Sequence, residues 1–168
     1  MERHRPGEDR LSKPAPAAAD ELAIHQLVAR YCDAVARRDS VACGATFASD
    51  AKWDLLGMHA KGRDAIVELW SGLVGSINWV VQVPAFGLVD VTGDVGRGRW
   101  YVTEYSHADD GTVGMLIGVY EDDYCKEQGT WAFAHRQFHM MYMGSPDMSG
   151  TFQPFSRPSL ESRNGLSG

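Results

Sequence analysis

The feature that most constrains the fold is a change of hydrophobic period near Ser76. Before this point apolar residues recur every three or four positions, which is typical of amphipathic helices, and after it they alternate as in strands. Four long β-rich runs follow, at 78–92, 95–107, 112–125 and 130–143, and each break between them contains a glycine. Strands joined by such short turns are antiparallel neighbours, and strands of this length twist and curl.

The residues before Ser76 predict three helices that can cover the concave side of the curled sheet. Asp20 is the predicted N-cap of the first helix, whose apolar stripe runs to Val35. A short helix at about 40–47 and a third after Asp64 follow, with a strand at 52–61 between them. We therefore predict the α+β class: a cone-shaped α+β barrel made of a curved, mostly antiparallel sheet capped by three N-terminal helices.

The chain divides into three parts. Residues 1–19 lack periodicity and contain a Pro-Ala run, so we expect a disordered arm there. Residues 20–143 form the single folded domain. Residues 144–168 are rich in Ser, Pro, Gly and Asn and are predicted to be an irregular tail, in which Phe152 and Phe155 can fold back over the domain.

Charge and composition exclude several classes of partner. The net charge is −6 and most basic residues are dispersed, so nucleic acid is not expected to bind. No apolar run approaches the roughly 20 residues that span a bilayer, and no apolar stretch follows the charged N-terminal residues as in a signal peptide. Three widely spaced cysteines indicate a reducing, cytoplasmic location.

Six short segments, taken in order, resemble the SnoaL-like families of the nuclear transport factor 2 superfamily. They lie within roughly residues 20–143 and read RYCDAVARRD, FASDAKWD, GRDAIVELW, DVTGDVGRGRWYVTEY, GVYEDDYCKEQGTW and AHRQFHMMY. The resemblance implies the cone-shaped fold. It also implies enzymes such as scytalone dehydratase, hexachlorocyclohexane dehydrochlorinase and ketosteroid isomerase, which need no cofactor. Other members of the superfamily only bind or assemble.

One departure from this resemblance concerns the acid–base pair. In the dehydratase and dehydrochlorinase branches, a carboxylate stands three residues before the position of Asp39 and pairs with a histidine on the first long strand. Here the carboxylate position is Ala36, and the histidine position falls at Val81 or Gln82. Either another group transfers the proton or the chain is not an enzyme.

Two residues are candidates for the missing base. Asp33 lies one helical turn before the absent carboxylate, and its alternative role is a solvated ion pair with Arg37 at i+4. His59 shares a strand face with Trp53 and Leu55 if no bulge intervenes, and the resemblance places that face toward the cavity. The alternative for His59 is a histidine at the rim, near a turn.

Two further residues are candidates for stabilising negative charge. The resemblance turns Tyr101, Thr103 and Tyr105 inward, so the Tyr105 hydroxyl is a predicted donor to an oxyanion; the alternative is a set of core tyrosines. The resemblance also turns Arg136 inward, where a guanidinium needs an anionic partner such as Asp33 or a substrate enolate. The alternative for Arg136 is a structural ion pair.

A larger set of residues is predicted to hold the substrate: Trp53, Leu55, Tyr101, Thr103, Tyr120, Phe138 and Met140. No metal site and no cofactor are expected. His135 and His139 are spaced i, i+4, but on a strand this spacing separates them by about 13 Å.

These observations predict a cofactor-independent lyase, dehydratase or isomerase that transfers a proton on a hydrophobic small molecule, aromatic or polyketide-like. The alternative is a ligand-binding or assembly protein, as in the small β subunits of ring-hydroxylating dioxygenases. The outer sheet face is predicted to be apolar, which favours a homo-oligomer. The resemblance favours a trimer over a dimer.

Overall fold

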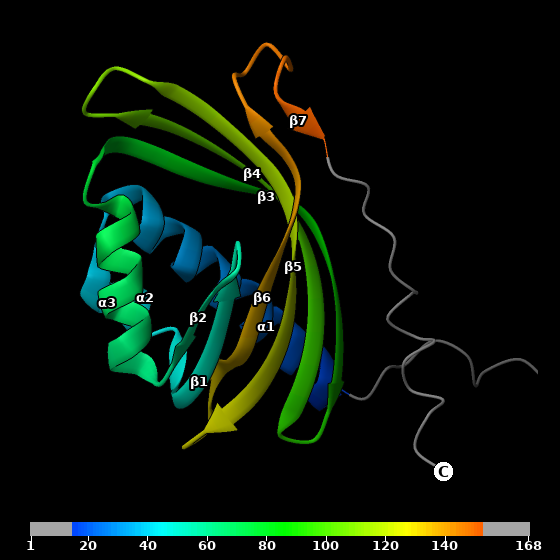
Figure 1. The fold of residues 1–168 in the computed structure, drawn as a ribbon. Helices are drawn as coiled ribbons and strands as arrows, with labels where there is room; N and C mark the ends of the chain where they lie inside the picture. Colours follow the sequence, from blue (N-terminus) through cyan, green and yellow to red (C-terminus); the bar gives the residue numbers. More distant parts are fainter. Residues whose placement is uncertain (1–14, 153–168) are drawn as a thin grey trace, which may run out of the picture.

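The computed structural model of the chain describes residues 15–152. Three helices precede most of the sheet (Figure 1): α1 (Ala15–Arg37), α2 (Ser40–Gly44) and α3 (Arg63–Val74). The strands are β1 (Phe47–Leu55), β2 (Met58–Lys61), β3 (Ile77–Thr92), β4 (Val95–Ala108), β5 (Val113–Glu127), β6 (Thr130–Gly144) and β7 (Thr151–Phe152). None of the helices in this range is long and apolar enough to cross a membrane.

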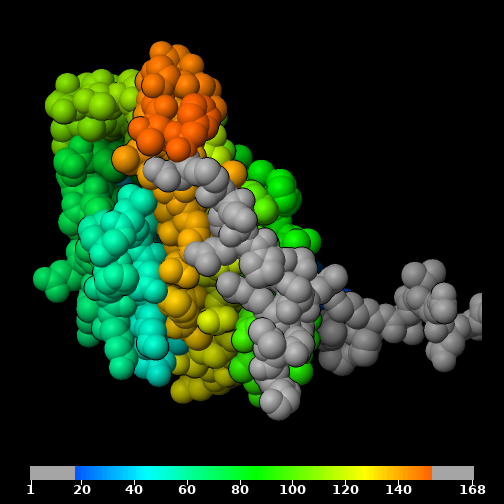
Figure 2. All heavy atoms as spheres, turned by 45° about the vertical axis from the view of Figure 1, so that its right-hand side comes forward, coloured from blue at the N-terminus to red at the C-terminus, as the bar shows by residue number. Residues whose placement is uncertain are grey.

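The strands form one curved sheet in the order β2-β1-β6-β5-β4-β3, with β7 paired to β6. All neighbouring strands are antiparallel except β1 and β6, which are parallel. The helices lie on the concave side (Figure 1). Figure 2 shows the β1–β2 hairpin beside β6, with β7 above it. The predicted α+β class, with a curved sheet capped by three helices, is confirmed.

Interruptions in strand register accompany the curvature of the sheet. The pairing shifts between Pro84 and Phe86 in β3, and β5 and β6 shift at Ile117/Gly118 and at Asp123/Tyr124. Such bulges bend a strand and increase its local twist. Proline cannot donate to a ladder, and β3 tolerates Pro84 because it is the edge strand.

The core lies between α1 and the concave face of the sheet. The apolar stripe of α1, including Ile24, Leu27 and Tyr31, is almost fully buried. The Tyr31 ring packs edge-on against Phe47 and Phe133, with ring centroids 6.1 and 5.8 Å away. These contacts fix α1 against the concave face of the sheet.

The first helix begins earlier than predicted. It starts at Ala15, so Asp20 lies inside α1 and is not its N-cap. The Pro-Ala run can start a helix because alanine is the best helix former and proline is tolerated in the first turn. The Asp20 carboxylate instead accepts hydrogen bonds from Lys126 Nζ at 2.7 Å and Trp131 Nε1 at 2.9 Å, which joins α1 to the sheet.

Two other segments differ from the sequence prediction. The strand expected at 52–61 is a hairpin, because Leu56 and Gly57 form a turn with φ of 50° and 83°. The tail contributes a short strand, and the Phe152 ring packs against Tyr142 with centroids 4.8 Å apart. Phe155 lies outside the described residues.

Candidate functional site

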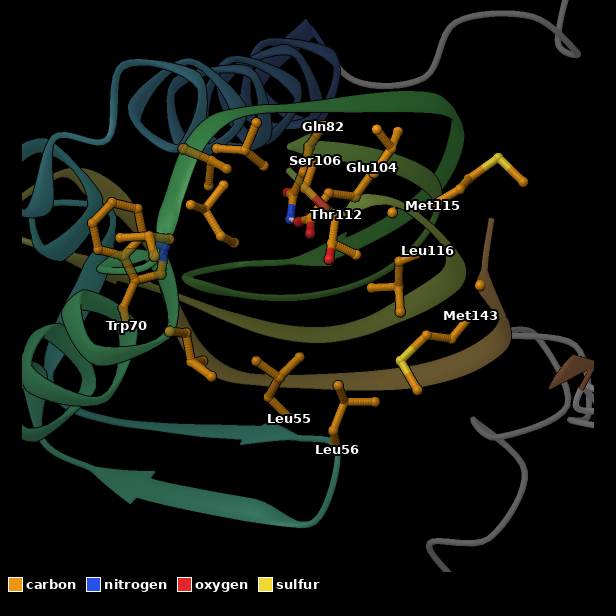
Figure 3. A pocket seen from close by; sticks show the side chains of 18 of the residues that line it. Leu55, Leu56, Trp70, Gln82, Glu104, Ser106, Thr112, Met115, Leu116 and Met143 are labelled. Atoms are coloured by element: carbon orange, nitrogen blue, oxygen red, sulfur yellow. Dashed lines mark hydrogen bonds between the residues drawn. The ribbon is translucent and has the colours of Figure 1, made fainter. Parts of the chain in front are cut away.

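A cavity of about 640 Å³ opens on the concave side of the sheet. Its apolar lining consists of Val35, Trp53, Leu55, Leu56, Trp70, Leu73, Val74, Ile77, Val80, Val113, Met115, Leu116 and Met143. The other lining residues are Tyr31, Gln82, Glu104, Ser106, Thr112, Gly114, Tyr120, Gly144 and Ser145. In Figure 3 the polar side chains of Gln82, Glu104, Ser106 and Thr112 gather on one side of the cavity. This volume suits a drug-sized organic molecule.

A glutamate is the only charged residue among the described residues that line the cavity. Glu104 on β4 pairs in register with Gln82 on β3, and Gln82 Nε2 donates to Glu104 Oε2 at 2.7 Å. Burial raises the pKa of Glu104, and the hydrogen bond from Gln82 partly opposes that rise. A carboxylate of raised pKa, held by an amide and facing an apolar cavity, can act as a general base.

A tyrosine hydroxyl lies next to this carboxylate. Gln82 Nε2 is 3.5 Å from the Tyr120 hydroxyl oxygen, and the Tyr31 hydroxyl also interacts with it. Burial raises the pKa of Tyr120 to about 12, so the phenol keeps its proton at neutral pH. Because both neighbours can donate to the Tyr120 oxygen, its own proton is left to donate to a ligand. Such a donor can stabilise negative charge on a substrate oxygen.

A buried ion pair lies among the rings of Tyr31, Tyr120 and Phe133, a region that we call the closed end. Arg136 Nε lies 3.2 Å from Asp122 Oδ1, and the two side chains are 1% and 0% exposed. The guanidinium carbon lies 3.7 Å from the ring centroid of Tyr120 and 4.2 Å from those of Tyr31 and Phe133. Arg136 therefore lies behind the aromatic floor of the cavity and is not among its lining residues.

Hydrogen bonds complete the surroundings of this aspartate. The Tyr124 hydroxyl donates to Asp122 Oδ2 at 3.0 Å, and Trp100 Nε1 donates to the Tyr124 oxygen at 2.7 Å. Burial raises the pKa of Asp122 to about 6, although Arg136 and Tyr124 act in the opposite direction. The anionic partner expected for Arg136 is Asp122 and not Asp33. This arrangement matches the structural ion pair considered as the alternative.

Asp33 lies away from the cavity. The cavity is lined by Tyr31 and Val35 of the same helix, and Asp33, two residues from each, points to the other side. Its side chain is 63% exposed, and it accepts a hydrogen bond from Arg37 Nε at 2.8 Å. Asp33 therefore forms the solvated ion pair with Arg37 that was its alternative role.

His59 also lies outside the cavity, so the prediction that it shares the inward face of Trp53 and Leu55 is wrong. The turn at Leu56 and Gly57 reverses the chain, so His59 pairs with Asp54 and not with the inward-facing positions of β1. The His59 side chain is 74% exposed, and its Nδ1 lies 2.6 Å from Asp54 Oδ1. The other Asp54 oxygen lies 2.7 Å from His135 Nε2.

The predicted inward face of β4 is shifted by one residue. Glu104 and Ser106 line the cavity, so Tyr101, Thr103 and Tyr105 occupy the opposite face of the strand. Tyr105, the predicted catalytic tyrosine, pairs with positions on the outer face and is 37% exposed. Both faces of β4 carry aromatic residues, so alternation alone did not identify the inner one.

The other predicted residues lie on the inner face. Trp53, Leu55 and Tyr120 line the cavity as expected. Phe138 and Met140 pack within or against the core without lining the cavity, and the Phe138 ring lies 5.0 Å from that of Tyr120.

Most residues that line the cavity were not among the predicted site residues, and those missed include the polar residues Gln82, Glu104 and Ser106. One signal pointed toward Gln82, because it occupies one of the two positions at which the resemblance expects the histidine. Glu104 carried a weaker signal, as a carboxylate within a β-rich run whose neighbours are uncharged.

Comparisons with solved structures show the same fold. A Mycobacterium tuberculosis protein of unknown function is 25% identical, with a TM-score of 0.67 over 73% of this chain and 77% of its own. A Novosphingobium aromaticivorans protein named as a candidate scytalone dehydratase is 19% identical, with a TM-score of 0.73 over 84% and 97%. The type 3 hexachlorocyclohexane dehydrochlorinase of Novosphingobium barchaimii is 20% identical, with a TM-score of 0.70 over 84% and 97%.

A comparison with curated protein sequences gave no match. The family model for the SnoaL-like domain matches residues 16–137, which is most of the described part of the chain. The match begins in α1 and ends within β6, so it includes most of the residues that line the cavity, whereas Met143, Gly144 and Ser145 lie beyond it. The chain belongs to the SnoaL-like domain family.

Proposed function

We propose that this protein is a cofactor-independent lyase or isomerase that transfers a proton on a hydrophobic small molecule, with Glu104 as the general base. The observation that carries the proposal is a lone carboxylate in an apolar cavity, held by the Gln82 amide and facing no cation among the described lining residues. Such a group can take and return a proton, and burial raises its pKa above the ordinary glutamate value.

The chemistry follows from the two groups on this side of the cavity. Glu104 removes a proton from a carbon next to a substrate carbonyl, and the C–H electron pair moves into an enolate. The Tyr120 hydroxyl donates a hydrogen bond to the enolate oxygen. The protonated Glu104 then returns the proton to another carbon, which is isomerisation. Alternatively, a leaving group departs from the β carbon with its bonding pair, which is elimination.

The apolar walls support an aromatic or polyketide-like substrate. The rings of Trp53 and Trp70 line the cavity and offer flat apolar surfaces to fused rings. Two of the structurally similar proteins carry the names of a dehydratase and a dehydrochlorinase, which is consistent with elimination. In this proposal Tyr120 takes the role predicted for Tyr105, and Arg136 supports the aromatic floor without contacting substrate.

Proton exchange on a model ketone tests the proposal. We expect the wild-type protein to accelerate exchange of the α protons of 2-tetralone in deuterated water, measured by proton NMR. Glu104→Gln should slow this exchange by about 100-fold or more, because general-base catalysis contributes that much. Glu68→Gln, at an exposed glutamate of α3, is the matched control and should leave the rate unchanged.

Equal exchange rates in wild type and Glu104→Gln would remove Glu104 from the mechanism. Binding of 2-tetralone without any acceleration of exchange would favour a ligand-binding protein over an enzyme.

We also propose that the chain self-associates, with a trimer favoured over a dimer, and that it acts in the cytoplasm. Val83, Phe86 and Leu88 on β3 support association, because their exposed fractions are 47%, 60% and 56%. Light scattering coupled to size exclusion measures the mass directly, and a monomer at micromolar concentration would contradict this proposal.

A further inference from the structure

We infer that the cavity binds apolar amines as cations, with the ammonium group of the ligand paired to Glu104 Oε1. This inference concerns the cavity of the proposed function, but it adds a class of ligand and does not require Glu104 to act as a base. It begins from a carboxylate that lines the cavity and has no cationic partner within residues 15–152.

One oxygen of the Glu104 carboxylate is open to the cavity. Oε2 accepts a hydrogen bond from Gln82 Nε2 at 2.7 Å. Oε1 accepts no hydrogen bond from the described residues and is not fully buried, so a molecule in the cavity can reach it. An ionised carboxylate only accepts hydrogen bonds, so the ligand group that meets Oε1 is a donor.

The charges around the cavity favour a donor that is positively charged. Glu104 is the only charged residue among the described residues that line the cavity. Burial raises its pKa, and the group that opposes this rise is the neutral amide of Gln82, so no described cation stabilises the carboxylate. A carboxylate in apolar surroundings is stabilised by an opposite charge, since burial disfavours the charged form. An ammonium group at Oε1 supplies that charge, whereas an anionic ligand would add repulsion.

The nearest candidate for an internal cation is already paired elsewhere. The Arg136 guanidinium lies 3.2 Å from Asp122 and behind the ring of Tyr120, and Arg136 is not among the residues that line the cavity. Because Asp122 balances its charge, Arg136 neither neutralises Glu104 nor turns the cavity into a site for anions. The counter-ion of Glu104 is therefore expected to come from the ligand.

The rest of the cavity favours an amine on an apolar body. In Figure 3 the side chains of Ser106 and Thr112 lie with Glu104 on one side of the cavity. Their hydroxyl oxygens can accept from the other N–H groups of an ammonium. Trp70 and Leu55 line the cavity away from this polar side, where they can cover rings or an aliphatic chain (Figure 3). The ligand is therefore a primary or secondary amine with a hydrophobic body.

Three naphthalene derivatives of similar size test the inference, with dissociation constants measured by isothermal titration calorimetry at pH 7. The cation is 2-naphthylmethylammonium, its neutral counterpart is 2-naphthylmethanol, and the anion is 2-naphthoate. Each is titrated into wild type, Glu104→Gln and Glu68→Gln. The last variant is the matched control, because Glu68 is exposed on α3 and does not line the cavity.

We expect wild type to bind the ammonium at least about tenfold more tightly than the naphthoate, because a charge-assisted hydrogen bond to Glu104 forms only with the cation. Glu104→Gln should weaken the ammonium by about tenfold and strengthen the naphthoate, while it changes the alcohol by less than about threefold. Glu68→Gln should change none of the three affinities. The alcohol is the internal check on folding, because a damaged cavity would lose all three probes together.

Tighter binding of the naphthoate than of the ammonium to wild type would overturn the inference. An equal loss of ammonium and alcohol in Glu104→Gln, or no binding of the ammonium at all, would overturn it as well. These outcomes are separate from those of the proposed function. Exchange of 2-tetralone that depends on Glu104, without any preference for the ammonium, would refute this inference alone. Preferred binding of the ammonium by a protein that does not accelerate exchange would refute the enzyme alone.

Discussion

Two carboxyl groups lie on the inner face of the sheet, Asp122 buried and Glu104 half-buried, and their neighbours give them different roles. Asp122 on β5 is opposite Gly98 of β4, and Glu104 lies 104 − 98 = 6 residues further along β4. At the rise of a strand this separation is about 20 Å. Burial raises the pKa of both groups. Asp122 has the guanidinium of Arg136 against it, whereas Glu104 has only the amide of Gln82.

The contrast between Asp122 and Glu104 teaches that a carboxyl of raised pKa becomes available for chemistry when its partner is neutral and when it faces a cavity. The ion pair of Asp122 is packed among aromatic rings, and neither of its residues lines the cavity of about 640 Å³. Glu104 faces a cavity of about 640 Å³ and can exchange its proton with a molecule held there. The closed end around Arg136 therefore supports the site, and the cavity at Glu104, which we call the open end, carries the proposed chemistry.

The largest expected effect comes from breaking the buried ion pair between Arg136 and Asp122. Arg136→Met removes the only charged group paired with Asp122 among the residues that the structure describes, and leaves a buried carboxyl without its cation. Such a change should lower the free energy of unfolding by about 3–5 kcal/mol, measured by urea denaturation. Arg97→Met is the matched control, because its pair with Asp123 is about half exposed, and it should cost less than about 1 kcal/mol.

A double variant sharpens this test. Asp122→Leu combined with Arg136→Met should recover much of the lost stability, because an apolar pair of similar volume needs no charge compensation. Equal stability of Arg97→Met and Arg136→Met would show that the buried pair contributes nothing to the fold.

A smaller effect is expected from the hydroxyl at the open end. Tyr120→Phe should slow exchange of 2-tetralone by about 10- to 100-fold, since the enolate loses a directed donor. Tyr105→Phe removes a hydroxyl from the outer face of the neighbouring strand and should leave the exchange rate unchanged. Slower exchange in Tyr105→Phe, with an unchanged rate in Tyr120→Phe, would instead support the catalytic role predicted for Tyr105 from the sequence.

The smallest effect is a change in pH dependence. Glu104 acts only when deprotonated, so the rate should rise with pH through the Glu104 pKa, which burial places above the ordinary glutamate value of 4.5. Gln82 lowers that pKa by donating to the carboxylate, so Gln82→Met should move the rising limb to higher pH. The rate on the high-pH plateau should change less than the rate on the limb.

Gln137→Met is a suitable control for this profile, because Gln137 lies on the outer face of β6. A rising limb that stays in place when Gln82 is replaced, measured by the initial rate of exchange between pH 4 and 8, would separate Gln82 from the ionisation of the base.

Much of the architecture could be predicted because periodicity is a local property of the chain. The change of period near Ser76 indicated helices followed by long strands, and the short turns required antiparallel neighbours. The inward positions of Trp53 and Arg136 also followed, since the resemblance covered their segments. The choice of face in β4 did not follow, because Tyr105 and Glu104 alternate on a strand with aromatic residues on both sides.

The sequence by itself determined the order of the elements and the apolar character of the interior, and the resemblance turned Arg136 inward without naming Asp122 as its partner. Only the tertiary structure decided which carboxyl received the guanidinium and which received an amide. The tertiary structure also decided that the chain turns at Leu56, which places His59 outside the cavity. The physical reason is that strand pairing and helix packing bring together residues distant in the chain, and a cavity is the space these contacts leave unfilled.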